Sequence, residues 1–450
     1  MTDERDIVLD ILMDIETNNT FSNTALGKAL KKNQFIEKNK RAFITRLSEG
    51  VVETRIKLDY IINQFSKLKS NKLKPVIRCI IRMGVYQLIF MDSVPDSAAC
   101  NEAVKLAKKH GLSGLSGYVN GVLRSIAKNK GSIKYPDIEK EYDKYLSVEY
   151  SVPEVLIKKI KKDYPSDYEQ ILKGCFTERE TSVRVHTPLV STVELKKMMA
   201  DEGIKVHNGY YSDKALLISE YDFIKRVPGY KQGFFTVQDE SSMCAVDDAF
   251  KEIKNISEDF ILLDMCAAPG GKTTAALEYM SGKGKAYSLD ISEEKLFLIE
   301  ENIERLGYEN AVVARHDSTY LIDKEEFGYD FDGNVDMVIA DVPCSGLGII
   351  GRKNDIKYRI NDESIKELII LQDKIIENAA SYVKKGGVLL YSTCTINPEE
   401  NDDRIEKLLK NRDDFKLIKK RHFLQGIDRC DGFFYAILKK ENAGCCINKL

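Results

Sequence analysis

The chain has 450 residues, more than the roughly 250 to 300 residues over which a single hydrophobic core keeps growing, so we expect several domains. Its 43% hydrophobic and 31% charged residues are typical of a folded globular protein and exclude a fibrous or largely disordered one. The net charge of −2 is unevenly distributed, because residues 17–140 carry 23 Lys and Arg against nine Asp and Glu. That balance favours a polyanionic partner such as nucleic acid.

The N-terminus is acidic and lacks the basic and apolar segments of a signal peptide. Apolar stretches such as residues 80–91 are interrupted by Arg82 and are shorter than the roughly 18 residues of a membrane span. We therefore expect a cytoplasmic protein without a membrane partner. The 10 cysteines form no Cys-x-x-Cys pair, which argues against a structural metal site, and we expect four of them to be buried apolar residues: Cys79, Cys100, Cys175 and Cys244.

The first part of the chain, residues 1–135, shows apolar residues at helical spacing and predicts an all-α domain. Residues 136–235 predict a small α/β domain, with a strand at 181–188, a helix at 192–201 and a strand at 215–219.

Residues 236–440 repeat an order of apolar strand, turn and helix, which predicts a doubly wound, Rossmann-like α/β domain, followed by a tail at 441–450. Six strands are expected, at 260–264, 285–290, 311–317, 335–341, 387–392 and 433–438. Parallel sheets of this kind bind ligands at the carboxyl ends of their strands.

A turn of small residues follows the first of these strands and opens a helix: Cys266, Ala267, Ala268, Pro269, Gly270, Gly271 and Lys272. Small residues let the backbone approach a ligand closely. A Walker A loop requires glycine where Cys266 stands, and the G-x-G-x-x-G pattern of a dinucleotide loop is absent. An adenosyl cofactor without a polyphosphate fits the turn better than ATP does.

Aspartates mark the ends of four successive predicted strands: Asp264, Asp290, Asp317 and Asp341. These strand ends share one edge of the sheet, and a carboxylate at Asp290 suits the two hydroxyls of a ribose. One or two of the four have an alternative interpretation as N-caps of the following helices.

Two cysteines lie just beyond strand ends, Cys344 in Asp-Val-Pro-Cys-Ser-Gly and Cys394 in Ser-Thr-Cys-Thr. Neighbouring loops of such a sheet open into one crevice, so the two thiols are expected to share a site with the cofactor.

These motifs, in this order, resemble those of the Sun family of RNA 5-methylcytosine methyltransferases: Cys-Ala-Ala-Pro-Gly-Gly-Lys-Thr, Asp-Val-Pro-Cys-Ser and Ser-Thr-Cys-Thr-x-x-x-x-Glu-Asn. Upstream, residues 82–88, 101–104 and 120–124 resemble the NusB-like RNA-binding domain. The resemblance covers nearly the whole chain. Asp402 departs from the glutamate common in the family but keeps the charge.

The resemblance implies a class I methyltransferase fold that uses S-adenosyl-L-methionine to methylate carbon 5 of a cytosine in small-subunit ribosomal RNA. It implies Cys394 as the nucleophile and Cys344 as the residue that helps to release the product. Carbon 5 is too electron-poor to take a methyl group until a thiolate has added to carbon 6. Asp341 is expected to hydrogen-bond or protonate the ring, and Lys272 is a candidate for lowering the pKa of the thiol. We expect a monomer without a metal.

Several alternatives stay open at this point. The thiol roles are reversed in the related DNA enzymes, which use the Pro-Cys cysteine as nucleophile. Relatives also act on transfer RNA, and the basic N-terminal half is compatible with a non-catalytic RNA-binding factor. An ATPase built on Gly270 to Thr273 is the weakest alternative.

Overall fold

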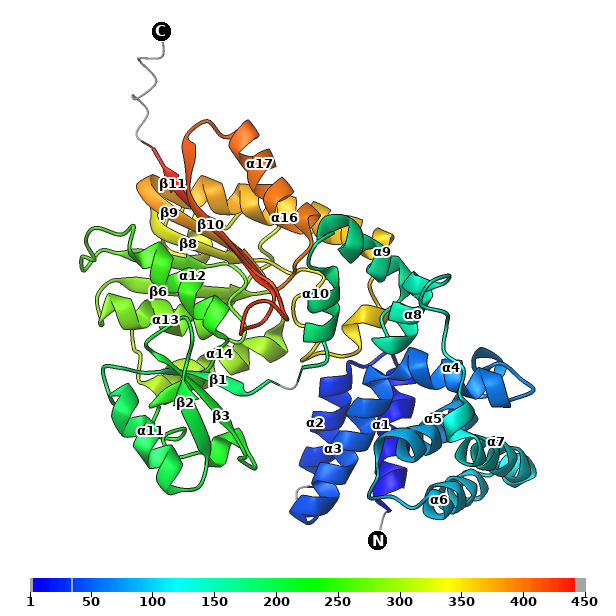
Figure 1. The fold of residues 1–450 in the computed structure, drawn as a ribbon. Coiled ribbons are helices and arrows are strands. Elements are labelled where there is room, and N and C mark those ends of the chain that lie inside the picture. Colours follow the sequence, from blue (N-terminus) through cyan, green and yellow to red (C-terminus); the bar gives the residue numbers. More distant parts are fainter. Residues whose placement is uncertain (1–2, 34, 178, 442–450) are drawn as a thin grey trace. The chain divides into compact units, whose positions relative to one another are not determined.

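The computed structural model describes residues 3–33, 35–177 and 179–441. The chain forms two compact units, which we describe separately (Figure 1). Unit 1 comprises Met1–Phe176 and Ile350–Arg359, and unit 2 comprises Thr177–Ile349 and Ile360–Leu450. Within the described residues, no helix combines the length and the apolar character that crossing a membrane requires.

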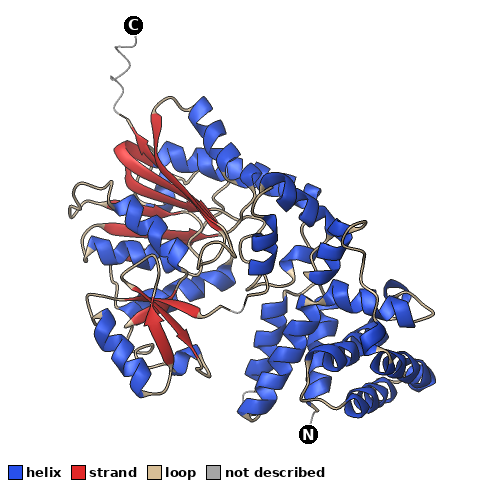
Figure 2. Cartoon of the chain, in the orientation of Figure 1, coloured by secondary structure: helices blue, strands red, loops and turns tan. Residues whose placement is uncertain are grey.

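Within its described residues, unit 1 consists of helices joined by loops, with no strand (Figure 2). Its α-helices are α1 (Glu4–Thr17), α2 (Ser22–Lys32), α3 (Lys38–Glu53), α4 (Arg55–Phe65), α5 (Pro75–Phe90), α6 (Asp96–Lys109), α7 (Ser116–Lys128), α8 (Tyr142–Glu149), α9 (Glu154–Asp163) and α10 (Tyr168–Gly174). Short 3₁₀ helices lie at Ser70–Lys72, Ser113–Leu115, Lys130–Ser132 and Ile356–Tyr358. Helix α5 is apolar around most of its circumference and packs against α1, α3, α4, α6 and α7, as expected of a central helix.

Residues 142–174, which the sequence placed with the middle domain, form α8 to α10 and belong to unit 1. The reason is that α8 packs against α4 of the same unit. Leu146 of α8 and Leu156 of α9 are both buried. Sequence spacing identifies such helices without showing which core they join.

The segment Ile350–Arg359 also belongs to unit 1, although in sequence it lies between two strands of the larger sheet of unit 2. Ser22 donates hydrogen bonds from its backbone N and its Oγ to the buried Asp355 carboxylate, at 3.1 and 2.8 Å. The Lys357 ammonium, also buried, donates to the carbonyl oxygen of Glu53 at 2.9 Å. Burial lowers the pKa of Lys357 to about 8.

Unit 2 contains a small antiparallel sheet in the order β2-β3-β1-β4. Its elements are β1 (Thr181–Val185), α11 (Thr192–Asp201), β2 (Lys205–Asn208), β3 (Ala215–Ser219), a 3₁₀ turn at Ile224–Arg226 and β4 (Phe235–Val237). Helix α11 begins at a capping box, in which the side chains of Ser191 and Glu194 each accept a hydrogen bond from the backbone N–H of the other residue.

The larger sheet of unit 2 has seven strands in the order β10-β11-β9-β8-β5-β6-β7. The strands are β5 (Ile261–Asp264), β6 (Lys285–Asp290), β7 (Ala311–Arg315), β8 (Val335–Asp341), β9 (Val383–Thr393), β10 (Phe415–Phe423) and β11 (Phe433–Lys440). The helices are α12 (Glu240–Phe250), α13 (Gly271–Met280), α14 (Glu293–Leu306), α15 (Lys324–Phe327), α16 (Asp362–Tyr382) and α17 (Asp402–Asn411), with a 3₁₀ turn at Pro398–Glu400.

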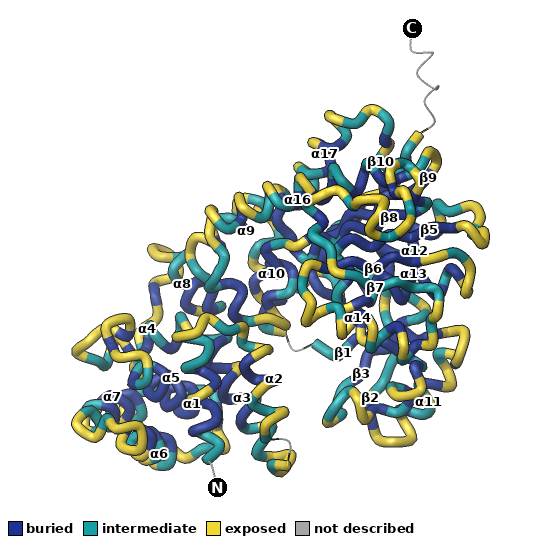
Figure 3. Tube along the Cα trace, turned by 180° about the vertical axis from the view of Figure 1, so that it is seen from behind, coloured by how far each residue is buried: buried dark blue, intermediate teal, exposed yellow. Residues whose placement is uncertain are grey.

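Strands β7, β6, β5, β8 and β9 run parallel, β11 pairs antiparallel with β9, and β10 pairs antiparallel with β11. Strand β5 lies between β6 and β8, so the strand order reverses there and opens the crevice in which such sheets bind ligands. Both faces of the sheet are covered, with Leu262 in one hydrophobic core and Leu263 in the other. Figure 3 shows the resulting concentration of buried residues in the central strands.

The predicted α/β fold with an all-α N-terminal domain is confirmed. The strand β10 was missed because five of its nine residues are basic or histidine, as is common where an edge strand faces solvent. Strands β2 and β4 were missed because they are only four and three residues long. Residues 442–450 of the expected tail lie outside the described residues.

Candidate active site

The glycine-rich turn leads from β5 into α13 at the switch point of the sheet. The backbone N of Ala267 donates to the carbonyl oxygen of Leu289 on β6 at 2.8 Å, which ties the turn to the neighbouring strand. Gly270 has φ 96°, in the left-handed region that glycine adopts readily, and a Cβ there would lie 3.3 Å from Ile299. The Ala268–Pro269 bond is cis. The turn therefore brings bare backbone to the carboxyl edge of the sheet, at which parallel sheets of this kind bind ligands.

Asp290 ends β6 beside this turn, whereas Asp317 lies two residues beyond β7, because that strand ends at Arg315 and not at Asp317 as the sequence predicted. One Asp290 oxygen accepts a hydrogen bond from the backbone N of Ala268 at 3.3 Å, and the other accepts from the N of Ser292 at 3.0 Å. Asp317 accepts from both the N and the Oγ1 of Thr319, at 3.0 and 2.8 Å. Asp290 thus connects the glycine-rich turn to β6, whereas Asp317 shapes its own loop.

Asp264 is fully buried at the end of β5. Thr273 donates to its Oδ2 at 2.7 Å, while Oδ1 has no hydrogen-bond partner among the described residues. Burial is the main cause that raises the pKa of Asp264 to about 7, and the Asp341 charge adds to it. An unpartnered buried acceptor beside a bare backbone turn fits a cofactor that carries an ammonium group.

Lys272 and Asp341 form an ion pair at 2.6 Å between α13 and the end of β8. The Lys272 ammonium also lies 5.0 Å from the centroid of the Phe433 ring. The second oxygen of Asp341 accepts a hydrogen bond from Ser392 Oγ at 2.7 Å. Asp341 is therefore held from both sides, and its side chain stays about one-third exposed.

The two predicted thiols lie together, with Cys344 Sγ 3.3 Å from Cys394 Sγ. The loops that carry them are joined at the backbone, because Gly348 N donates to the carbonyl oxygen of Cys394 at 3.1 Å. The hydrogen bond with Cys394 and then burial raise the pKa of Cys344 well above its usual range. Cys344 therefore holds its proton within the pair.

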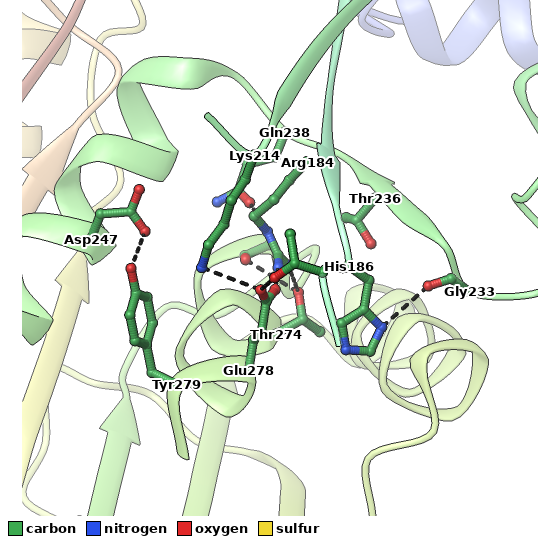
Figure 4. A network of polar contacts seen from close by, with 12 residues as sticks. Arg184, His186, Lys214, Gly233, Thr236, Gln238, Asp247, Thr274, Glu278 and Tyr279 are labelled. Atoms are coloured by element: carbon green, nitrogen blue, oxygen red, sulfur yellow. Dashed lines mark hydrogen bonds and ion pairs between the residues drawn. The ribbon is translucent and has the colours of Figure 1, made fainter. Parts of the chain in front are cut away.

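A residue that the sequence did not single out, Arg184 of β1, ties the small sheet to α13 (Figure 4). Its guanidinium donates to Gln238 at 2.7 Å, and on α13 to Thr274 at 3.0 Å and Glu278 at 2.5 Å. Lys214 is a second partner of Glu278, at 3.2 Å. The alternation of β1 gave no signal for this role, because an arginine in a strand is usually solvent-exposed.

Replacing Arg184 by methionine should destabilise unit 2 by about 3 kcal/mol, because removal of one member of a buried pair leaves a buried charge poorly compensated. Equilibrium urea unfolding measures this change. The control is Lys225→Met, since the Lys225–Glu301 pair is largely exposed and such pairs contribute at most about 1 kcal/mol. Equal destabilisation by both variants would contradict the anchoring role of Arg184.

Comparison with known families matches three stretches of the chain. Residues 252–439 match the family described as 16S rRNA methyltransferase RsmB/F. Residues 2–128 match the NusB family, and residues 152–222 match the ferredoxin-like domain of RsmF/B-like methyltransferases.

Curated proteins of similar sequence match almost the full length. The chain is 35% identical over 417 residues to the probable ribosomal RNA small subunit methyltransferase B of Bacillus subtilis, covering 92% of this chain and 90% of that protein. It is 32% identical to the corresponding probable enzyme of Synechocystis, covering 92% and 91%. It is 31% identical to ribosomal RNA small subunit methyltransferase B of Proteus mirabilis, covering 92% and 93%.

Solved structures share the fold. The crystal structure of PH0851 superposes with a TM-score of 0.82 at 24% identity, covering 98% of this chain and 99% of that one. NSun6 from Pyrococcus horikoshii, crystallised with SFG, an S-adenosylmethionine analogue, gives a TM-score of 0.56 at 21% identity, covering 64% and 98%.

Proposed function

We propose that this chain, which belongs to the ribosomal RNA small subunit methyltransferase B family, methylates carbon 5 of a cytosine in 16S ribosomal RNA from S-adenosyl-L-methionine. The observation that carries the proposal is the pair of thiols 3.3 Å apart, in loops that follow the strands β8 and β9. An RNA-binding factor or an ATPase has no use for two adjacent thiols beside an acidic strand end.

Asp264, Asp290 and the turn from Cys266 to Gly271 would hold S-adenosylmethionine, which supplies an electrophilic methyl group when bound. The unpartnered Asp264 oxygen offers an acceptor for its ammonium. Asp290, which ends β6 next to the turn, offers carboxylate oxygens for ribose hydroxyls. We assign Asp317 to the same rim, on the neighbouring loop.

Cys394 is the nucleophile in this proposal. A thiol that keeps its proton donates a hydrogen bond, so Cys344 stabilises the thiolate form of Cys394. Cys394 adds to carbon 6 of the cytosine, and the electron-rich carbon 5 then takes the methyl group. Lys272 and Asp341 face the negative charge that develops on the ring, with the ammonium offsetting it and the carboxyl group hydrogen-bonding the ring edge.

Cys344 assists the last stage. The carbon 5 proton must leave before the bond between carbon 6 and Cys394 can break. Once Cys394 is bonded to the ring, Cys344 loses the hydrogen bond that contributes most to its raised pKa. The Cys344 thiol then gives up its own proton to solvent, and its thiolate is placed to take the carbon 5 proton, after which the bond between carbon 6 and Cys394 breaks.

The base must be exposed before the thiol can attack it, and extraction from a stack costs least in a loop or bulge. The basic helical unit supplies lysines and arginines for phosphate contacts that position the RNA without reading its sequence.

The test of this function uses labelled S-adenosylmethionine and small-subunit RNA from cells that lack the gene. We expect label in one cytosine, located by bisulfite mapping, and no label in transfer RNA. Label in transfer RNA alone would show that the substrate is transfer RNA and that the methylation chemistry is unchanged. Absence of transfer to either RNA would reject the enzyme and favour an RNA-binding factor.

The affinity for S-adenosylmethionine should rise as the pH increases through about 7 and fall again above about 8, where the α-amino group of the cofactor loses its proton. The cofactor's ammonium favours the charged form of Asp264, whose pKa burial raises to about 7, so binding below that pH must release a proton. Calorimetric titration between pH 5.5 and 8.5 measures this dependence. In Asp264→Asn the rise through about pH 7 should vanish while the fall above about pH 8 remains, and an unchanged profile in that variant would contradict the assignment.

In the protein without cofactor, the raised pKa of Asp264 makes the free energy of unfolding fall as the pH rises, whereas the cofactor affinity rises through the same pH. A carboxyl whose pKa is raised on folding stabilises the fold fully below its unfolded pKa, and this contribution is lost as the pH rises through about 7. Asp264→Asn should therefore gain stability relative to the wild type as the pH rises over that range.

A further inference from the structure

Glu400, in the 3₁₀ turn Pro398–Glu400, has a fully buried side chain between the loops that carry the two thiols. It lies six residues beyond Cys394 and contacts residues adjacent to both cysteines. The mechanism proposed above gives it no role.

Toward the Cys344 loop, Glu400 accepts a hydrogen bond from the backbone N of Ser345 at 2.8 Å and another from the Ser345 hydroxyl. Gln372 of α16 contributes from the side, since its Nε2 donates to Glu400 at 3.0 Å and to the carbonyl oxygen of Pro343 at 2.9 Å. The residues on both sides of Cys344 are thus tied to one carboxylate, directly or through Gln372.

Toward the Cys394 loop, Glu400 Oε2, which also accepts from the Ser345 hydroxyl, accepts from Asn397 Nδ2 at 2.9 Å. Thr395 Oγ1 lies 3.5 Å from the same oxygen and 2.7 Å from the hydroxyl of Ser345. The chain neighbours of the two cysteines therefore meet directly, and one carboxylate spans them.

The contacts of Glu400 are all with neutral donors, and no cation forms an ion pair with it among the described residues. Taking a carboxylate out of water without a cation is costly unless hydrogen bonds satisfy its oxygens. A carboxylate is acceptor-only, so it can receive these donors from separate loops at once, which an amide of the same shape cannot do. These hydrogen bonds therefore position the two loops, and they do not neutralise the charge of Glu400 with a cation.

We propose that Glu400 is a positioning residue that holds the loops of Cys344 and Cys394 together and so fixes the distance between their sulfurs. The inference deepens the proposed function, on which it rests for the view that both thiols take part in the reaction. Glu400 does not touch the substrate and acts only through the loops.

The first test measures the sulfur geometry without RNA or cofactor. Mild oxidation of the full chain with oxidised dithiothreitol should form a disulfide between Cys344 and Cys394, which peptide mass spectrometry detects. In Glu400→Gln the NH₂ group of the new amide faces N–H and O–H groups that donate hydrogen bonds to the wild-type carboxylate. We therefore expect this disulfide to form at least about 10-fold more slowly. Glu406→Gln, on the exposed face of α17, removes the same charge and should cross-link at the wild-type rate.

The second test separates positioning from a general loss of structure. Because small displacements of reacting groups cost up to about 100-fold in rate, kcat for methyl transfer should fall by about 10- to 100-fold in Glu400→Gln. The KM for RNA and the affinity for S-adenosylmethionine should stay within about 2-fold, since neither binding surface contains Glu400.

Three results would overturn the inference: a wild-type chain that does not cross-link, a Glu400→Gln variant that cross-links at the wild-type rate, or a loss confined to KM. If Glu400→Gln does not fold, Ser345→Ala replaces it, because that change removes the hydroxyl between Glu400 and Thr395 while leaving the carboxylate in place. Wild-type cross-linking in Ser345→Ala would then reject the role. Cross-linking needs no turnover, so an inactive wild-type chain that still cross-links would count against the proposed function alone.

Discussion

Cys394→Ala will lower methyl transfer by at least about 1,000-fold, because without a sulfur at carbon 6 the carbon 5 of cytosine stays too electron-poor to react. The measurement is transfer of labelled methyl from S-adenosylmethionine to unmethylated small-subunit RNA. Binding of both substrates should persist, since the cofactor turn and the basic unit are unchanged. Cys244→Ala, which removes a buried thiol of the same unit outside the two loops, should keep activity within about 2-fold.

The complementary variant, Cys344→Ser, should accumulate a covalent complex with RNA. In that variant addition and methyl transfer proceed while release is slowed, so a band that resists denaturation should appear on a gel. Accumulation in Cys394→Ser instead would show that the two thiols have exchanged roles, as in the related DNA enzymes. Full activity of Cys394→Ala would reject the mechanism in which Cys394 adds to the cytosine ring.

Gly348→Ala should reduce methyl transfer by about 100-fold or more, because the backbone around the thiols has no room for a Cβ. A Cβ at Gly348 would lie 1.9 Å from the carbonyl oxygen of Gly432 and 2.9 Å from that of Cys394. Both neighbours are backbone atoms held by hydrogen bonds, Gly348 N to Cys394 O at 3.1 Å and Gly432 N to Gly348 O at 2.9 Å. The added methyl group must therefore displace the loop that carries Cys394.

Methyl transfer and cofactor binding, measured on the same preparation, separate this local effect from unfolding. Cofactor binding should persist, because the turn from Cys266 to Gly271 is not part of the Gly348 contact. Gly27→Ala is the matched control, since a Cβ on that exposed helical glycine meets no atom within 4 Å. An active Gly348→Ala would mean that the loop moves freely and that the thiol spacing is not set by this packing.

Much of this protein is determined by local sequence. The bounds of β3, β6, β8 and α11 are those that the hydrophobic pattern predicts, because each has strong periodicity and clear turn residues at its ends. The strand-end positions of Asp264, Asp290 and Asp341 followed from the same pattern. The placement of Cys344 and Cys394 in neighbouring loops followed from the rule that parallel strands present their carboxyl ends at one edge.

Other features depended on partners distant in sequence. No local signal joins Ile350–Arg359 to the helical unit, because its buried contacts, such as Asp355 with Ser22, span more than 300 residues. The burial of Arg184 is decided by Glu278 and Thr274 on another element. Through periodicity and turn chemistry, the sequence thus determined which residues lie at the carboxyl edge of the larger sheet, where the candidate active site is. Only the tertiary structure decided how they are held, because the hydrogen bonds that hold Cys344, Cys394 and Glu400 form between segments that meet only after the sheet has assembled.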